Sequence, residues 1–230
     1  MLMAAGGPGA EAKRRSARVR AGLWHRCAKR GLDLVLSPML LLLLGPLILF
    51  IAIAVKVHSP GPVLFRQIRI GKHGKPFICL KFRSMREDAD PGLHRDYMRR
   101  LIDNNVAPSQ HGGSLKMAND TRITNLGRIL RRFSIDELPQ LINVLRGEMS
   151  LVGPRPHLPC EVELYEEWHK GRLQVLPGIT GWWQIKGRNR VAFDELVRMD
   201  LYYIEHMSLW LDLKIILLTP WEALLGKGAG

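Results

Sequence analysis

The sequence is poor in the residues that build disulfide frameworks and zinc sites. It has three cysteines in 230 residues, Cys27, Cys79 and Cys160, with no Cys-X-X-Cys pair and no histidine cluster at zinc-ligand spacing. A disulfide scaffold and a zinc finger are therefore excluded, and the cysteines indicate reduced cytoplasmic thiols. Acidic residues are also few, since 21 Asp and Glu stand against 34 Lys and Arg, a formal net charge of +13. This excess predicts a polyanionic partner: nucleic acid, anionic lipid or a phosphorylated substrate.

One long uncharged segment is present, residues 34–55, and it is about long enough to cross a bilayer. A soluble nucleic-acid-binding domain has no use for such a segment. It is not a cleaved signal peptide, because a long basic leader precedes it and no fitting cleavage site follows. Ser37 and Pro38 interrupt it near its start, where proline removes a backbone donor and clashes with the preceding turn. We therefore expect a bend at Ser37-Pro38.

Basic residues flank this segment on both sides. Eight Lys and Arg lie within residues 13–30, and seven lie within residues 56–83. The positive-inside rule places both flanks on the cytoplasmic side, and a re-entrant helix satisfies that placement. A one-pass anchor with Pro38 as a kink is the alternative, since membrane helices tolerate proline. Residues 1–20, biased toward Gly, Ala and Arg, are predicted to be a flexible leader that meets an anionic surface.

Two adjacent carboxylates, Asp136 and Glu137, follow Arg131 and a second arginine. Ser134 with Glu137 three residues later matches a capping box, and apolar residues at helical spacing follow up to Gly147. We therefore expect both carboxylates in a first helical turn. The helix dipole favours acidic residues there, so capping by itself is one explanation of the pair. Glu137 alone completes the cap, however, and adjacent carboxylates beside arginines are suited to holding a divalent metal and a phosphate ester together.

A second anion-binding pattern is Gly153-Pro154-Arg155-Pro156, which follows the short apolar run 149–152. Pro154 and Pro156 restrict the backbone around Arg155, so its guanidinium is presented from a stiff loop. The planar fork of a guanidinium suits phosphate recognition. A surface turn with an incidental arginine is the alternative.

From residue 58 onward the sequence predicts a compact α/β domain. Residues 63–70 and 77–83 are expected to be two strands joined by a turn at 71–76. In the second strand, Lys81 and Arg83 share the face opposite the apolar side chains. Paired cations on one strand face would flank a diphosphate, although a solvated polar face fits the pattern as well.

Further elements follow in outline. A helix is expected over residues 92–102, and a polar loop over residues 104–119 is suited to moving over a substrate. Residues 177–181 show turn chemistry, and residues 193–207 are expected to form a helix.

Residues 209–218 are strongly apolar but too short to span a bilayer, and they contain Asp212 and Lys214. We expect an amphipathic helix at the membrane interface, bracketed by Trp210 and Trp221 as in an aromatic belt. An ordinary buried helix of the domain is the alternative.

These motifs together resemble the bacterial sugar transferase family, the monotopic phosphoglycosyl transferases. The resemblance runs from about residue 29 to residue 218 in the family's order, and its motifs are residues 61–67, 81–85, 134–140 and 147–156. It implies a basic leader (1–20), a re-entrant membrane helix (21–57) and a cytoplasmic-face α/β catalytic domain (58–230) with interfacial amphipathic helices. The chain resembles a minimal form, without the multi-helix membrane region of longer relatives.

The resemblance also implies an activity. Members move a sugar 1-phosphate from a UDP-sugar to polyprenol phosphate and release UMP, as the first membrane step of glycan or exopolysaccharide assembly. The implied place is the inner face of the bacterial cytoplasmic membrane, in contact with inner-leaflet lipids. A homo-oligomer is compatible with this family, and nucleic acid is not an expected partner.

Individual residues match family positions. Asp136 matches the nucleophile, Glu137 matches its partner that binds Mg²⁺, and Arg131 matches the arginine five residues before the nucleophile. Arg155, between Pro154 and Pro156, matches the arginine near the nucleotide. Lys81 and Arg83 are further candidates for substrate contact.

Two other classes of function explain parts of the sequence. A membrane-tethered nucleic-acid-binding module explains the charge, but aromatic-basic strand signatures and a recognition-helix pattern are absent from the sequence. A non-catalytic lipid-binding scaffold explains residues 34–55 and the leader, but not Asp136 and Glu137 beside Arg131.

Overall fold

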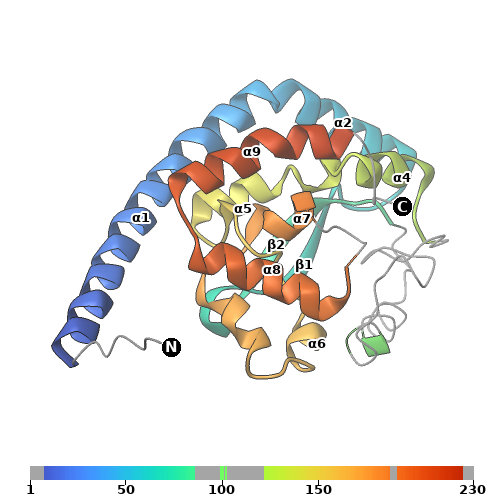
Figure 1. Ribbon diagram of the computed structural model, residues 1–230. Helices are drawn as coiled ribbons and strands as arrows, with labels where there is room; N and C mark the ends of the chain where they lie inside the picture. Colours follow the sequence, from blue (N-terminus) through green and yellow to red (C-terminus); the bar gives the residue numbers. More distant parts are fainter. Residues whose placement is uncertain (1–7, 86–98, 101, 103–121, 187–190, 225–230) are drawn as a thin grey trace.

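The computed structural model describes residues 8–85, 99–100, 102, 122–186 and 191–224. It begins with two helices, α1 (Pro8–Leu43) and α2 (Gly45–His58), that arch over the rest of the chain (Figure 1). The predicted leader is helical from Pro8 onward as the first part of α1, and this part extends away from the domain. The loop predicted over residues 104–119, and most of the helix predicted over residues 92–102, lie outside the described residues.

The bend in the N-terminal segment is not where the sequence predicted it. α1 is helical through Ser37 and Pro38, and the bend of 62° follows Leu43 instead. Leucines on both sides of Pro38 pack on the hydrophobic core and hold α1 continuous; they are Leu36, Leu40 and Leu41. Pro46 lies in the first turn of α2, where its missing N–H removes no helical hydrogen bond.

Among the described residues, no single helix is long and apolar enough to cross a bilayer. One bent pair, His25–Leu43 with Gly45–His58, passes the same test of length and composition. Both helices carry exposed apolar side chains, which include Leu34, Val35, Met39, Leu42, Leu43, Leu47, Leu49, Phe50, Ile53 and Val57. So many neighbouring apolar side chains are unusual on a surface that faces water.

The two predicted strands are confirmed as an antiparallel hairpin of β1 (Leu64–Ile70) and β2 (Pro76–Phe82). A short 3₁₀ turn, η1 (Lys72–Gly74), joins them. Ile51 and Val55 of α2 form a buried cluster with Phe82 of β2 and with Leu130, which lies on α4 (Asn125–Arg132). This cluster fixes the end of the bent helix pair to the hairpin.

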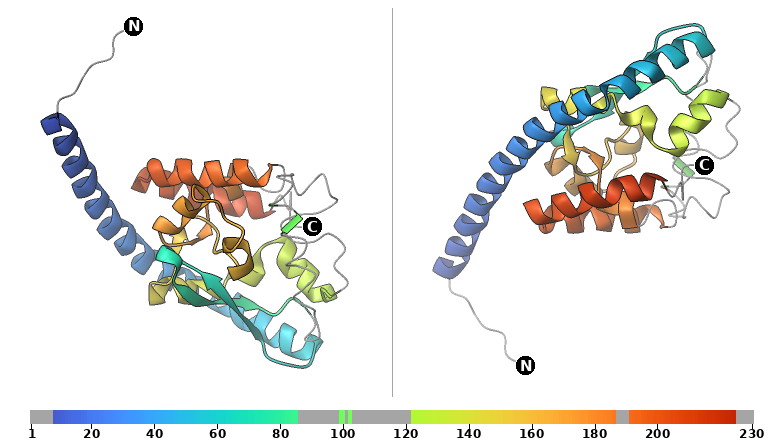
Figure 2. Two further views of the ribbon diagram at one scale, coloured as in Figure 1. Left: turned by 90° about the horizontal axis from the view of Figure 1, so that it is seen from below. Right: turned by 90° about the horizontal axis from the view of Figure 1, so that it is seen from above.

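The main core lies between α1 and the C-terminal helices. Its buried side chains come from β2, α5 (Gln140–Arg146), β3 (Ser150–Val152), α7 (Trp182–Lys186), α8 (Phe193–Glu205) and α9 (Leu209–Leu224), together with the loop before β3. Figure 2 shows α8 and α9 side by side along one side of the domain, and the helix pair with the hairpin along the other. The helix predicted over residues 193–207 is therefore confirmed.

A second small sheet was not predicted. β3 pairs in parallel with β4 (Gly178–Thr180), so that Val152 is opposite Thr180. The sequence indicated only a turn at residues 177–181, because three residues that begin with glycine show no strand alternation. Other short helices in the described part of the chain include α6 (Pro159–Val162), η4 (His169–Gln174) and α7 (Trp182–Lys186). The mixture of helices and sheets agrees with the predicted α/β class.

Candidate active site

The two adjacent carboxylates lie in a tight turn between two helices. This turn is η3 (Ile135–Glu137), and it follows Ser134, whose φ of 57° is left-handed. The predicted capping box is wrong, because the side chain of Ser134 makes no capping hydrogen bond. α5 begins only after Pro139, whose ring presets a helical φ and needs no N–H acceptor. Asp136 and Glu137 therefore precede α5 and do not lie in its first turn.

Asp136 is buried. Its exposed fraction is only 3%, and its Oδ1 has no hydrogen-bond partner in the part of the chain that the structure describes. A buried carboxylate oxygen without a partner destabilises a folded protein, so such groups call for a functional explanation. Capping does not supply one here, because Asp136 lies outside any α-helix.

Glu137 has a defined cationic neighbour. The Nζ of Lys81 donates to its Oε1 at 2.7 Å, and both side chains are largely buried. Lys81 projects from β2, so this ion pair fastens the η3 turn to the hairpin. An ion pair shielded from water is screened far less than one on the surface.

One face of the hairpin carries several further polar groups. The register places Gln67 opposite Cys79 and Arg69 opposite Phe77, on the same face as Lys81. Arg69 is buried, and its guanidinium donates to the Oε1 of Gln67 through Nε at 3.0 Å and Nη2 at 2.6 Å. Its Nη1 donates to the carbonyl of Pro156 at 2.9 Å. Arg69 therefore links the hairpin to the loop that carries the Pro-Arg-Pro pattern.

The backbone of that loop is held from two sides. Gly178 donates its N–H to the carbonyl of Pro154 at 2.7 Å, and Gly153 donates to the carbonyl of Thr180 at 2.9 Å. On the hairpin side, Ile70 donates to the carbonyl of His157 at 2.8 Å. These bonds support the stiff presentation that the sequence predicted for the arginine between them.

Arg155 is the half-buried residue at the centre of this loop. Within the described part of the chain its guanidinium has no hydrogen-bond or ion-pair partner. Since the backbone on both sides of it is fixed, the position of its Cα is fixed while its five donors stay available.

Close packing of glycines shapes the same loop. A Cβ on Gly178 would lie 2.1 Å from the backbone nitrogen of Gly153. We expect Gly178→Ala to lower the free energy of unfolding by about 2 kcal/mol or more, because backbone cannot move aside as a flexible side chain can. Thermal unfolding measures this change. Gly31→Ala is the control, since a Cβ there meets nothing within 4 Å in the middle of α1. An equal loss in both variants would contradict the packing argument.

The charges of these elements act on one buried point, the Cys79 thiol. Burial raises the pKa of Cys79, and the charges of Lys81, Arg69 and Arg155 lower it while that of Glu137 raises it. The charges of the hairpin, of the η3 turn and of the Pro-Arg-Pro loop therefore all act on the pKa of this thiol. The ion pair of Lys81 with Glu137 brings the η3 turn, which also carries Asp136, to the hairpin.

All of these elements fall inside one matched segment. A family model described as "Bacterial sugar transferase" matches residues 24–226. The chain belongs to the bacterial sugar transferase family. The match includes the bent helix pair from residue 24 onward as well as the site.

Relatives in this family share close to half of the aligned residues. Galactosyl transferase CpsE of Streptococcus agalactiae is 45% identical over 206 residues, and UDP-glucose:undecaprenyl-phosphate glucose-1-phosphate transferase of Escherichia coli is 42% identical over 213 residues. Each alignment covers 89% of this chain, but only 44% and 42% of those two relatives, respectively. Exopolysaccharide production protein ExoY of Rhizobium meliloti is 42% identical over 202 residues, which is 88% of both chains.

Two other predicted site residues lie on α4 and at the end of β2. Arg131 is partly buried in the last turn of α4, before the carboxylates. Arg83 was predicted to share with Lys81 a strand face that would flank a diphosphate, but it is buried against the segment after α2. Its guanidinium donates to the carbonyls of Pro60 and Ser59, both at 2.6 Å. Arg83 therefore fastens β2 to the segment after α2, a contact that strand alternation cannot reveal.

Sequence reasoning missed two residues that organise the site, Arg69 and Asn143. The side-chain amide of Asn143 on α5 accepts from the N–H of Leu80 at 3.0 Å and donates to the carbonyl of Ile78 at 2.7 Å. It thus acts as a further pairing partner for β2 and ties α5 to the hairpin. The alternation of Gln67 and Arg69 along β1 was the available signal for Arg69, whereas nothing local marks Asn143.

The carboxylates also bear on the Mg²⁺ that the family resemblance implies. Among the described residues, no group of three or more His, Cys, Asp or Glu side chains is arranged to hold a metal. Mg²⁺, however, commonly uses only one or two carboxylates and takes its other oxygens from water and substrate phosphates. The unpartnered Oδ1 of Asp136 next to Glu137 fits this smaller donor set.

Proposed function

We propose that this protein transfers a sugar 1-phosphate from a UDP-sugar to polyprenol phosphate, giving polyprenol diphosphate sugar and UMP. The observation that carries the proposal is the buried Asp136 with its unpartnered carboxylate oxygen, next to the ion pair of Glu137 with Lys81. The names of the Escherichia coli and Rhizobium relatives support the reaction class and a place in exopolysaccharide assembly.

The reaction divides into two displacements at one phosphorus. The carboxylate of Asp136 attacks the sugar-bearing phosphorus, and the bond to the UMP oxygen breaks, so that UMP leaves with the electron pair. This forms an acyl phosphate that carries the sugar. A phosphate oxygen of polyprenol phosphate then attacks the same phosphorus and restores the carboxylate. Burial of Asp136 keeps water from the acyl phosphate between the two steps.

The cations of the site reduce the repulsion between the anionic nucleophile and the anionic diphosphate of the UDP-sugar. Arg155 neutralises an oxygen of the diphosphate, and its fixed loop holds the fork in place. Lys81 holds Glu137, and Glu137 with the neighbouring carboxylate would hold Mg²⁺. When bound, Mg²⁺ would neutralise charge on the diphosphate.

Release of UMP tests the proposal. Purified protein is incubated with a panel of UDP-sugars, Mg²⁺ and polyprenol phosphate, and UMP is measured. We expect UMP with at least one sugar and only in the presence of the protein. Absence of UMP with every UDP-sugar would refute the activity and leave a non-catalytic role on the membrane.

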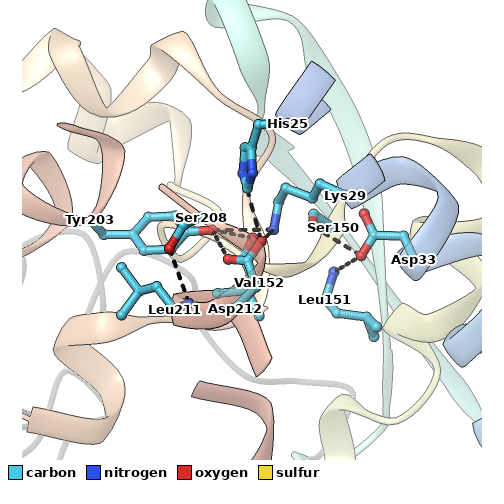
Figure 3. A network of polar contacts seen from close by, with 10 residues as sticks. All are labelled: His25, Lys29, Asp33, Ser150, Leu151, Val152, Tyr203, Ser208, Leu211 and Asp212. Atoms are coloured by element: carbon cyan, nitrogen blue, oxygen red, sulfur yellow. Dashed lines mark hydrogen bonds and ion pairs between the residues drawn. The ribbon is translucent and has the colours of Figure 1, made fainter. Parts of the chain in front are cut away.

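The proposal includes a re-entrant membrane helix on the cytoplasmic face of the inner membrane. The bent pair α1–α2 has the length and composition for the membrane, and its two flanks are both basic. α9 contacts α1, where Nζ of Lys29 on α1 lies 3.0 Å from the carboxylate of Asp212 on α9 (Figure 3). Its inner face is buried at Asp212 and Ile215, whereas Trp210 and Trp221 are 78% and 64% exposed. We infer that this outer face of α9 lies at the lipid interface.

Re-entry predicts that Arg20 and Lys72 lie on the same, cytoplasmic, side of the membrane. Arg20→Cys and Lys72→Cys are made in a background where Cys27 and Cys160 are serine, since Cys27 is exposed. A membrane-impermeant thiol reagent applied to intact cells should label neither position, and both should react after lysis. Labelling of position 20 from outside would restore the one-pass anchor.

We also expect Arg155→Lys to fail to restore turnover, with a loss of about tenfold or more, because a point charge cannot reproduce a bidentate fork. The KM for the UDP-sugar and kcat are measured from UMP release. Lys170→Arg is the control, since Lys170 is exposed and pairs only with Glu167 among the described residues. Turnover in Arg155→Lys equal to that of the wild type would show that Arg155 is only a turn residue.

A further inference from the structure

Behind the Pro-Arg-Pro loop, four polar side chains form a buried chain that leads to α8. Asp200 on α8 accepts from the Nε of Arg172 at 2.8 Å, and Nη2 of the same guanidinium lies 2.7 Å from the same oxygen. Nη1 of Arg172 donates to the hydroxyl of Tyr165 at 2.9 Å. That hydroxyl lies 2.8 Å from Nδ1 of His157. All four side chains are buried. We refer to these residues as the relay.

The guanidinium fixes the direction of one hydrogen bond in the relay. A guanidinium can only donate, so the oxygen of Tyr165 accepts from Arg172. The hydroxyl of Tyr165 keeps its proton and a second lone pair, so it pairs with Nδ1 of His157 in either tautomer of the ring. Burial, followed by the charges of Arg172, Arg69 and Arg155, lowers the pKa of His157 well below its usual value, so the ring is neutral.

The relay reaches Arg155 through the backbone of His157, two residues further along the chain. From the hairpin side, Arg69 and Ile70 hold the carbonyls of Pro156 and His157. From the α8 side, Tyr165 holds the ring of His157. The two sets of contacts hold the same short segment from different elements. The loop can therefore shift when one set of contacts is removed.

We propose that Tyr165 is a positioning residue for the donor nucleotide, and that it acts through His157 on the guanidinium of Arg155. The proposal rests on the proposed function of Arg155 and adds a residue that the family motifs do not contain. Tyr165 is buried, and none of its hydrogen bonds involves Asp136 or Glu137. Its effect should therefore fall on nucleotide binding and spare the carboxylate chemistry.

Tyr165→Phe removes only the hydroxyl. The ring of Tyr165 packs against Phe193 with centroids 5.9 Å apart and against His169 with centroids 5.7 Å apart, and phenylalanine keeps both contacts. The change cuts the relay between Arg172 and His157 without opening a cavity. Tyr202→Phe is the matched control, because Tyr202 is exposed on α8 and stacks only on His206 and Trp182 among the described residues.

A double-mutant cycle on UMP binding separates positioning from general stability. The dissociation constant of UMP is measured by calorimetry for the full chain in lipid nanodiscs, as wild type, Tyr165→Phe, Arg155→Ala and the double variant. We expect Tyr165→Phe to weaken UMP binding about tenfold. In the Arg155→Ala background the same change should have little further effect, since the group it positions is already gone. Tyr202→Phe should bind UMP as the wild type does.

Two results would contradict the proposed role of Tyr165. Unchanged UMP binding in Tyr165→Phe overturns it, and so does an equal loss in both backgrounds, because a purely structural role is additive. Where Tyr165→Phe lowers the melting temperature, binding is measured where all variants are folded. Arg172→Lys supplies a second cycle, since lysine cannot reach Asp200 and Tyr165 together as a fork. If the wild type releases UMP from a UDP-sugar but the cycles show no coupling to Arg155, only the proposed role of Tyr165 is wrong. If the wild type releases no UMP, the proposed function is wrong.

Discussion

Asp136→Asn is expected to lose essentially all turnover, by about 10⁴-fold or more, while still binding the UDP-sugar. If Asp136 is the nucleophile, the amide eliminates a covalent step rather than a binding contact. Folding should not suffer, because the change replaces a buried and unpartnered carboxylate oxygen with a neutral group of the same shape. UMP release, UDP-sugar binding and the melting temperature together measure these three expectations.

The covalent step predicts two further observations, one in the kinetics and one in the mass of the protein. UMP must leave before the acceptor arrives, so initial rates should show ping-pong kinetics. Intact-protein mass spectrometry with UDP-sugar and Mg²⁺ alone should find a phosphosugar adduct on the wild type and none on Asp136→Asn. Glu163→Gln is the control, since Glu163 is an exposed carboxylate outside the site. An adduct that persists in Asp136→Asn, or strictly sequential kinetics in the wild type, would remove Asp136 from the nucleophile role.

Glu137→Gln is expected to be impaired by about 100-fold, and raised Mg²⁺ should restore part of the turnover. The amide keeps the shape of the side chain but loses its charge, and with it the ion pair with Lys81 at 2.7 Å. A weakened metal site binds less Mg²⁺ at a given concentration, so a higher Mg²⁺ concentration should reduce the loss of turnover. The measurement is UMP release over a Mg²⁺ titration.

Asp136→Asn serves as the comparison in that titration, because no amount of metal replaces a missing nucleophile. If the Mg²⁺ dependence of Glu137→Gln matches that of the wild type, Glu137 does not hold the metal. Its contact with Lys81 would then serve to join η3 to the hairpin.

The elements that were predicted correctly are those whose signals are local. The hairpin follows from alternation within each strand and a glycine-rich turn between them. The helix over residues 193–207 follows from helical periodicity. The stiffness around Arg155 follows from the prolines on either side of it, since a proline ring restricts its own φ and the residue before it.

The elements that were wrong or missing depend on distant partners. The sequence predicted Ser134 to be a helix cap, but its backbone is left-handed and α5 starts after Pro139. The bend was expected at Pro38, yet packing of α1 on the core holds that stretch helical. β4 exists because β3 lies beside it, and its three residues carry no pattern of their own.

The sequence by itself determined which residues carry the chemistry: Asp136 and Glu137, the arginine between two prolines, and one apolar segment with basic flanks. These follow from residue type and short spacing, which the sequence shows directly. Only the tertiary structure decided how they are held. The ion pair of Lys81 with Glu137, the bridge from Arg69 to Pro156 and the contact of Arg172 with Asp200 in the relay all join residues far apart in the chain. Such contacts leave no periodic trace in a single sequence, because they depend on how distant elements pack and not on their neighbours in the chain.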